Sequence, residues 1–260
     1  MKASIIICTY NEEKTIADVV MACCKHNPDC EIIVVDDGST DNTEHILNEL
    51  SRTYSFRYER LQKNRGKSWA MAYGIEISEN EIILFFDADL SNILKEHFDE
   101  LLRPMFDNTA DMVLGQPSET LIDYRINPFK TLTGERALLK EDLIPVLDEI
   151  RDIRFGVETF LNLYYQALGK RINYVQLKGL IHPSTYEKSG SVSIATKKYL
   201  QEGKEIAITL MNNQDLINQR VRLLISNSNA NAKKRIDSLQ NEINRKLQDF
   251  KNKLDKFLVE

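Results

Sequence analysis

The sequence predicts an α/β fold in which a mostly parallel central sheet is flanked by helices and followed by a C-terminal helical extension. Residues 3 to about 115 alternate short apolar runs with helical patterns, as crossover-connected parallel strands do. Polar residues follow four consecutive strands, and open α/β sheets bind ligands at that end. From residue 193 onward the pattern is helical.

The elements are taken in order from their apolar patterns. Strands are expected at Ser4–Cys8, Glu31–Val35, Phe56–Arg60, Ile82–Phe86 and Asp111–Leu114. Helices are expected at Lys14–Cys24, Thr43–Ser51, Lys67–Ile77 and Lys95–Phe106. In the second half, Thr133–Leu138 is expected to open a helical stretch, Phe155–Phe160 to open another, and Arg171–Leu177 to form a strand.

Composition narrows the class of protein. The 260 residues are 42% hydrophobic, which is enough for a substantial core, and the net charge of -5 predicts no nucleic-acid partner. No apolar run approaches the roughly 20 residues of a membrane span, and the N-terminus lacks a signal-peptide pattern. The four cysteines show no paired C-x-x-C spacing, so reduced thiols in a cytoplasmic protein are expected. Glycine-rich dinucleotide and P-loop motifs are missing.

The run Ile82–Phe86 leads into two carboxylates, Asp87 and Asp89, with one alanine between them. Residues i and i+2 of an extended segment point the same way, so both carboxylates are able to face one cation. Mg²⁺ takes one or two carboxylates and completes its shell with water and substrate phosphates. The alternative is a solvated acidic turn that ends a strand.

Three other expected strands also end in polar blocks, at Thr9–Glu13, Asp36–Thr43 and Asn64–Lys67. Each has a purely structural interpretation, because such residues also cap helices and form turns. Four such blocks on neighbouring strand ends indicate one polar rim over the sheet.

These blocks, Ile5–Glu13, Glu31–Asp41, Asn64–Lys67 and Phe86–Asp89, together resemble the family 2 glycosyltransferases of the GT-A fold. The resemblance covers roughly residues 3–185, and its first block departs from the family only at Cys8. Thr133–Leu138 followed by Gly156-Val157-Glu158 is similar to the neighbourhood of polyprenyl-phosphate sugar transferases and glucosyl-3-phosphoglycerate synthases.

The resemblance implies a nucleotide-sugar donor, with a UDP-sugar favoured over GDP-mannose, and Mg²⁺ or Mn²⁺ as cofactor. It implies roles for the donor-side residues, with Asp37 at the base, Lys67 at ribose or diphosphate and Asp89 at the metal. The full donor set is Thr9, Tyr10, Asn11, Glu12, Asp37, Gly66, Lys67 and Asp87, and the metal set is Asp89, Asp87 and His182. The alternative for His182 is a structural or solvated histidine that binds no metal. His26, His45 and His97 are expected at the surface.

The resemblance also implies an acceptor side. Glu158 is expected to deprotonate or orient the acceptor. The alternative is a purely structural role, in which a carboxylate at a helix start interacts favourably with the helix dipole. Gly134 and Arg136 are expected to border the acceptor, whose identity is open, with a phosphate-bearing or lipid-linked acceptor among the candidates beside a soluble one. With Asp89, Glu158 forms the expected catalytic pair, and an inverting or a retaining outcome stays open.

The chain is expected to divide into a catalytic domain, residues 1–190, and a helical extension, residues 191–260. After a polar break at Ser226–Asn231, apolar residues from Ile236 to Phe257 recur every three or four positions. This amphipathic helix packs on its own domain, joins a homo-oligomer or lies on an anionic membrane surface. The protein is therefore expected in the cytoplasm or peripherally at the membrane.

The sequence thus predicts a metal-dependent glycosyltransferase that acts on an acceptor hydroxyl or phosphate. One alternative is a nucleotidyltransferase with a related sheet, but Thr9–Glu12 lacks the glycine-rich, basic first loop of that class. The other alternative is a non-catalytic nucleotide-sugar-binding assembly subunit.

Overall fold

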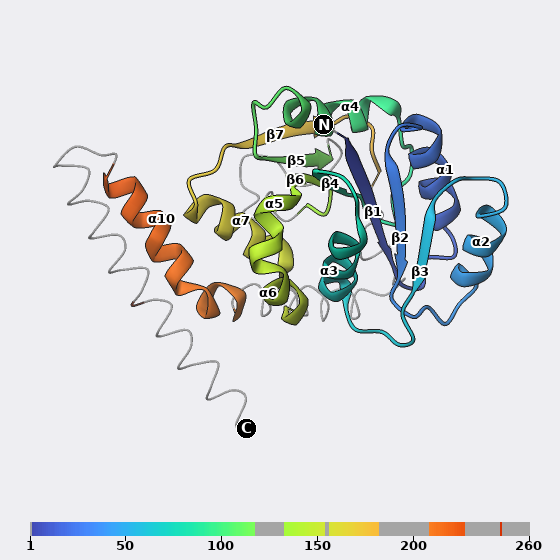
Figure 1. The fold of residues 1–260 in the computed structure, drawn as a ribbon, viewed down its shortest axis with the longest axis horizontal. Coiled ribbons are helices and arrows are strands. Elements are labelled where there is room, and N and C mark those ends of the chain that lie inside the picture. Colours follow the sequence, from blue (N-terminus) through green and yellow to red (C-terminus); the bar gives the residue numbers. More distant parts are fainter. Residues whose placement is uncertain (1, 118–132, 154–155, 182–207, 227–244, 246–260) are drawn as a thin grey trace.

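The computed structural model describes residues 2–117, 133–153, 156–181, 208–226 and 245. In these ranges, seven strands form one sheet in the order β3-β2-β1-β4-β6-β5-β7, with helices on both faces (Figure 1). The strands are β1 (Ala3–Thr9), β2 (Glu31–Asp36), β3 (Arg57–Arg60), β4 (Ile82–Phe85), β5 (Met112–Pro117), β6 (Arg136–Leu139) and β7 (Ile172–Leu177). The helices are α1 (Ile16–His26), α2 (Thr43–Leu50), α3 (Lys67–Ile77), α4 (Lys95–Phe106), α5 (Lys140–Leu143), the 3-10 turn η1 (Ile144–Val146), α6 (Leu147–Asp152), α7 (Val157–Ala167) and α10 (Gln214–Ser226).

The expected α/β fold with a mostly parallel sheet is confirmed. Strands β3, β2, β1 and β4 pair in parallel, and β5 pairs in parallel with β7. Strand β6 runs antiparallel to both of its neighbours, β4 and β5. The carboxyl ends of the four N-terminal parallel strands therefore meet at one edge of the sheet.

One expected element is wrong. Thr133–Leu138 does not open a helix, because Arg136–Leu139 forms strand β6 and helix α5 begins only at Lys140. This stretch pairs on one side with β4 and on the other with β5, so its main-chain hydrogen bonds are made by distant segments.

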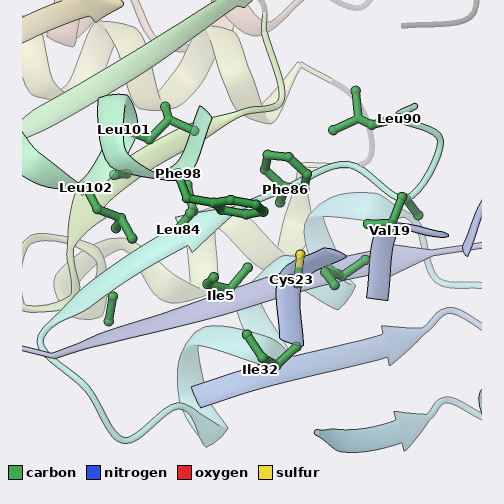
Figure 2. Close-up of a cluster of buried hydrophobic side chains, with 14 of the residues drawn as sticks. Ile5, Val19, Cys23, Ile32, Leu84, Phe86, Leu90, Phe98, Leu101 and Leu102 are labelled. Carbon is green, nitrogen blue, oxygen red and sulfur yellow. The ribbon is translucent and has the colours of Figure 1, made fainter. Parts of the chain in front are cut away.

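The sheet is covered on both faces by apolar cores. In β1, Ile5 and Ile7 face one core while Ile6 faces the other, because successive side chains of a strand point to opposite faces. The first core includes Val19 and Cys23 of α1 and Phe98 of α4 (Figure 2). The second core is built on α3, α6 and α7. Burial on both faces explains the unbroken apolar runs of β1, β2 and β4.

The C-terminal extension is described only in part. Helix α10 lies against α7, and Leu216 packs on the second core. The helix expected over residues 193–225 is confirmed across its described part, whereas the amphipathic stretch from Ile236 to Phe257 lies outside the described residues. Among the described helices, none combines the length and the apolar character that crossing a bilayer requires.

Candidate active site

A cavity of about 450 Å³ lies where the carboxyl ends of β1, β2 and β4 meet the start of α3. All four polar blocks contribute to its wall. The lining residues are Cys8, Thr9, Tyr10, Glu12, Asp37, Asn64, Gly66, Lys67, Ala70, Asp87, Ala88 and Asp89. The structure thus brings together most of the expected donor residues.

Asn11 does not line this cavity but joins the first polar block to the second. Its side-chain carbonyl accepts a hydrogen bond from the main-chain amide of Thr40 at 2.8 Å, and its main-chain amide donates to Ser39 Oγ at 3.0 Å. Asn11 has a φ of 58°, a left-handed conformation that asparagine tolerates better than most residues. Its place in the structure is therefore that of a loop support.

Asp37 holds the third polar block in place. Its two carboxylate oxygens accept hydrogen bonds of 2.7 Å from the main-chain amides of Arg65 and Gly66. Gly66 has a φ of 102°, which glycine alone adopts readily. Burial raises the pKa of Asp37, and the two amide hydrogen bonds only partly oppose this rise. Asp37 thus lies in the cavity wall and holds the loop that immediately precedes Lys67.

Lys67 lies at the centre of the charged groups. Its Nζ is 2.9 Å from Asp87 Oδ1 and 3.0 Å from Glu158 Oε1. Burial lowers the pKa of Lys67, but Asp87 and Glu158 more than offset this, so the pKa lies well above its usual value. The ammonium therefore stays charged and joins the acidic turn after β4 to the first turn of α7.

Glu158 occupies the first turn of α7, which begins after Gly156 in the left-handed conformation, φ 82°. Burial raises the pKa of Glu158, but the positive charges of Lys67 and then of Arg136 outweigh it, and the pKa is lowered. The carboxylate is thus ionised at neutral pH. It has the charge state that a proton acceptor needs.

Arg136, expected at the acceptor, is fully buried beneath α7. Its guanidinium donates to the Glu158 carbonyl at 3.3 Å, to Asn162 Oδ1 at 3.4 Å and to the Thr133 carbonyl. In this arrangement, the side chain supports the start of α7 and is not at the surface where an acceptor arrives.

Gly134 packs directly against Asp87. A Cβ at position 134 would lie 2.1 Å from Asp87 Oδ2, so any side chain there would require the Asp87 carboxylate or the main chain to shift. In the same turn, Thr15 Oγ1 donates to the Ala88 carbonyl at 2.8 Å. Two distant segments of the chain therefore contact the turn that carries Asp87 and Asp89.

The residues that line the cavity fit a hard divalent cation in part. Asp87 and Asp89 both face it, and carboxylate oxygens are the ligands that Mg²⁺ and Mn²⁺ accept. Two carboxylates leave the remaining positions to water and to a diphosphate. The described residues contain no group of three or more His, Cys, Asp or Glu side chains placed to hold a metal, and His182 lies outside them.

One residue differs from what the sequence indicated, and another, Cys8, lines the cavity without having been expected there. His97, expected at the surface, is only 2% exposed and hydrogen-bonds through both ring nitrogens. It lies three residues after Leu94, at the start of α4, but Leu94 and His97 do not form the Ser/Thr and Glu/Gln pair of a capping box, so no sequence pattern marked this position. Cys8 lines the cavity beside Lys67, and burial raises the pKa of its thiol to about 12.

Comparison with known proteins identifies the family. The sequence model of Glycosyl transferase family 2 matches residues 4–171. The chain belongs to this family. A dolichol-phosphate mannosyltransferase of Pyrococcus furiosus is 29% identical over 188 residues, which are 70% of this chain and 51% of that protein. A poly-beta-1,6-N-acetyl-D-glucosamine synthase of Staphylococcus epidermidis is 36% identical over 87 residues, 33% of this chain and 21% of that protein.

Solved structures confirm the GT-A fold. Glucosyl-3-phosphoglycerate synthase from Mycobacterium tuberculosis, crystallised with Mn²⁺, UDP and phosphoglyceric acid, has a TM-score of 0.64 at 21% identity, covering 81% of this chain and 78% of that one. TarS from S. aureus, residues 1–349 with UDP-GlcNAc, has a TM-score of 0.58 at 19% identity, covering 86% and 72%. The matches span no more than about half of these curated relatives' length. The family match decides against a nucleotidyltransferase.

Proposed function

We propose that this chain transfers a sugar from a UDP-sugar to an acceptor hydroxyl or phosphate, with Mg²⁺ or Mn²⁺ as cofactor. One observation carries the proposal. Three segments far apart in the sequence bring Lys67, Asp87 and Glu158 within 3.0 Å contacts at one edge of a 450 Å³ cavity. Family membership supports a nucleotide-sugar donor, and two structural relatives were crystallised with UDP or UDP-GlcNAc.

On the donor side, Thr9, Tyr10 and Glu12 receive the nucleoside in our proposal, and Asn11 supports their loop. Asp37 has a second role besides contact with the base, because its hydrogen bonds fix the Arg65 and Gly66 amides. Lys67 then turns towards the diphosphate. Its exposed side chain, 42% accessible, leaves room for this movement.

Asp87, Asp89 and His182 are the residues that would hold the cation. When bound, it neutralises charge that develops on the departing nucleoside diphosphate. Asp87 already shares its charge with Lys67, so we expect Asp89 to be the firmer ligand.

On the acceptor side, Glu158 accepts the proton of the attacking group or orients it. Its lowered pKa keeps it ionised, its side chain is 17% exposed, and it contacts Lys67, which lines the cavity. Gly134 borders the acceptor beside Asp87. Arg136 serves the acceptor through Glu158, since the guanidinium itself is buried. The helical extension mediates self-association or contact with a membrane surface.

Release of nucleoside diphosphate tests this function. UDP-glucose, UDP-GlcNAc and GDP-mannose are incubated with the protein, with Mn²⁺ or with EDTA, and the released nucleotide is measured. We expect release from a UDP-sugar that EDTA suppresses and that Asp89→Asn lowers by at least about 100-fold, the scale of a misplaced catalytic contact.

Asp99→Asn is the matched control, because Asp99 is an exposed carboxylate of α4 whose partner among the described residues is Lys95. A protein that binds a UDP-sugar but releases no nucleotide would instead be the non-catalytic nucleotide-sugar-binding subunit, and one that neither binds nor hydrolyses any donor would contradict both functions. Equal activity of the Asp89 and Asp99 variants would contradict the assigned metal ligand.

A further inference from the structure

The acidic turn after β4 is fastened to the exit of β7, a segment some ninety residues later in the chain. Ser91 and Ile181 form an antiparallel bridge in which each amide donates to the other's carbonyl at 3.0 Å. Next to it, Asn92 Nδ2 donates to the Gly179 carbonyl at 2.7 Å. Ser91 lies only two residues after Asp89, so this connection acts on the turn itself.

A buried histidine adds a third connection. His97 Nδ1 accepts a hydrogen bond from the Leu94 amide at 3.2 Å, so the ring proton must be on Nε2. Nε2 lies 2.9 Å from the Lys178 carbonyl and therefore donates to it. One neutral imidazole thus closes the first turn of α4 and holds the β7 exit.

Apolar packing backs these hydrogen bonds. Leu90 and Leu180 are both fully buried in the same core, one from each of the joined segments. Phe98, the neighbour of His97, packs on Phe86 with ring centroids 4.9 Å apart (Figure 2). Apolar packing therefore joins the two segments in addition to the hydrogen bonds.

We propose that His97 and Asn92 are positioning residues for the Asp87–Asp89 carboxylates. The inference rests on the proposed metal-dependent function. Other contacts of the turn include the Thr15 bond to Ala88, the Lys67 ion pair and the packing of Gly134. Groups that orient metal ligands typically change metal affinity by about 10- to 100-fold when removed. Neither residue lines the cavity where the donor and cation are proposed to bind.

Binding of Mn²⁺ in the presence of UDP, measured from the paramagnetic resonance signal of free Mn²⁺, tests the proposal without catalysis. The variants are Asn92→Gly, His97→Leu and His97→Gln. Asn92→Gly removes the amide but keeps the left-handed φ of 54° free of strain. Glutamine offers both an acceptor and a donor, and it suits this capping position.

We expect Asn92→Gly and His97→Leu each to weaken Mn²⁺ binding by about 10-fold and His97→Gln to restore most of it. Asn108→Gly is the matched control, because Asn108 also has a left-handed φ, 52°, and one side-chain hydrogen bond, but it follows the other end of α4. Its Mn²⁺ affinity should equal that of the wild type.

Wild-type affinity in Asn92→Gly and His97→Leu would overturn the positioning role alone. Equally weakened Mn²⁺ binding in Asn108→Gly would also overturn the positioning role, because the loss of any surface hydrogen bond would then explain the effect. A wild-type protein that binds no Mn²⁺ with UDP present would instead overturn the metal-dependent function, and the positioning role with it.

Discussion

A single methyl group at position 134 should disable the site through Asp87. The Cβ of Gly134→Ala would lie 2.1 Å from Asp87 Oδ2 and 2.4 Å from Oδ1, whereas real Cβ contacts stay above 3.0 Å. The two groups must therefore separate by about 0.9 Å, the difference between these distances. Strand β6 follows immediately and is paired on both sides, so its main chain resists the shift. The carboxylate moves instead and loses its 2.9 Å contact with Lys67.

The size of the effect follows from this displacement. A misplacement of about 1 Å at a reacting centre costs up to about 100-fold in rate, so we expect kcat/KM for the UDP-sugar to fall by roughly 30- to 100-fold. Overpacking of this kind also destabilises a protein by about 1–3 kcal/mol. Nucleotide release measures the first quantity and urea unfolding the second.

Asp87→Ser provides the background that isolates the cause. Without the carboxylate there is little for the new methyl group to strike, so Gly134→Ala should cost less than about 0.5 kcal/mol in Asp87→Ser. A Gly134→Ala enzyme with kcat/KM within twofold of the wild type would refute the reasoning. So would the same loss of stability in both backgrounds.

Three further predictions concern charge and burial. Lys67→Met removes the first cause of the low pKa of Glu158, so the rate should fall and the acid limb of the kcat/KM–pH profile should move to higher pH. Lys63→Met, an exposed change in the same loop, should leave that limb in place. An unmoved limb in Lys67→Met would contradict the pairing of Lys67 with Glu158. Arg171 lowers the pKa of Asp111. This pairing stabilises the folded protein above the ordinary aspartate pKa of about 3.9, and the stabilisation is lost as the pH falls through the lowered pKa. Arg171→Met should therefore have a lower urea midpoint than the wild type at pH 7, with the difference closing in acid, and a constant difference would rule this out. Cys8 should stay unlabelled by iodoacetamide at pH 8, as read by mass spectrometry, because burial raises its pKa to about 12; rapid labelling would show that the thiol is not buried in this way.

The sequence was most informative for strands that are buried on both faces of the sheet. Strands β1 and β4 are covered on both faces, so nearly every residue is apolar and the strand stands out as a continuous run. Helices α3 and α4 begin and end at the expected residues, Lys67–Ile77 and Lys95–Phe106. The polar blocks were equally visible, since a rim at the strand ends consists of consecutive residues.

Strand β6 shows where this reasoning ends. Glu135, Arg136, Ala137 and Leu138 all favour helices on intrinsic propensity, and no alternation marks them as a strand. They form a strand because β4 and β5 offer hydrogen bonds on both sides, and those partners lie more than 20 residues away. His97 was misjudged for the same reason, because its partner at Lys178 is 81 positions distant.

The burial of Arg136 could not be predicted either, yet it explains how Glu158 keeps its charge. Taking a guanidinium out of water is costly, and here three acceptors at Thr133, Glu158 and Asn162 offset that cost. Of the two cations that lower the pKa of Glu158, Lys67 is exposed and Arg136 is enclosed. When Lys67 turns to the diphosphate, as we propose, Arg136 is the one of these two cations that stays beside the carboxylate. A fixed, buried arginine therefore serves a base that must stay ionised after the donor has drawn the lysine away.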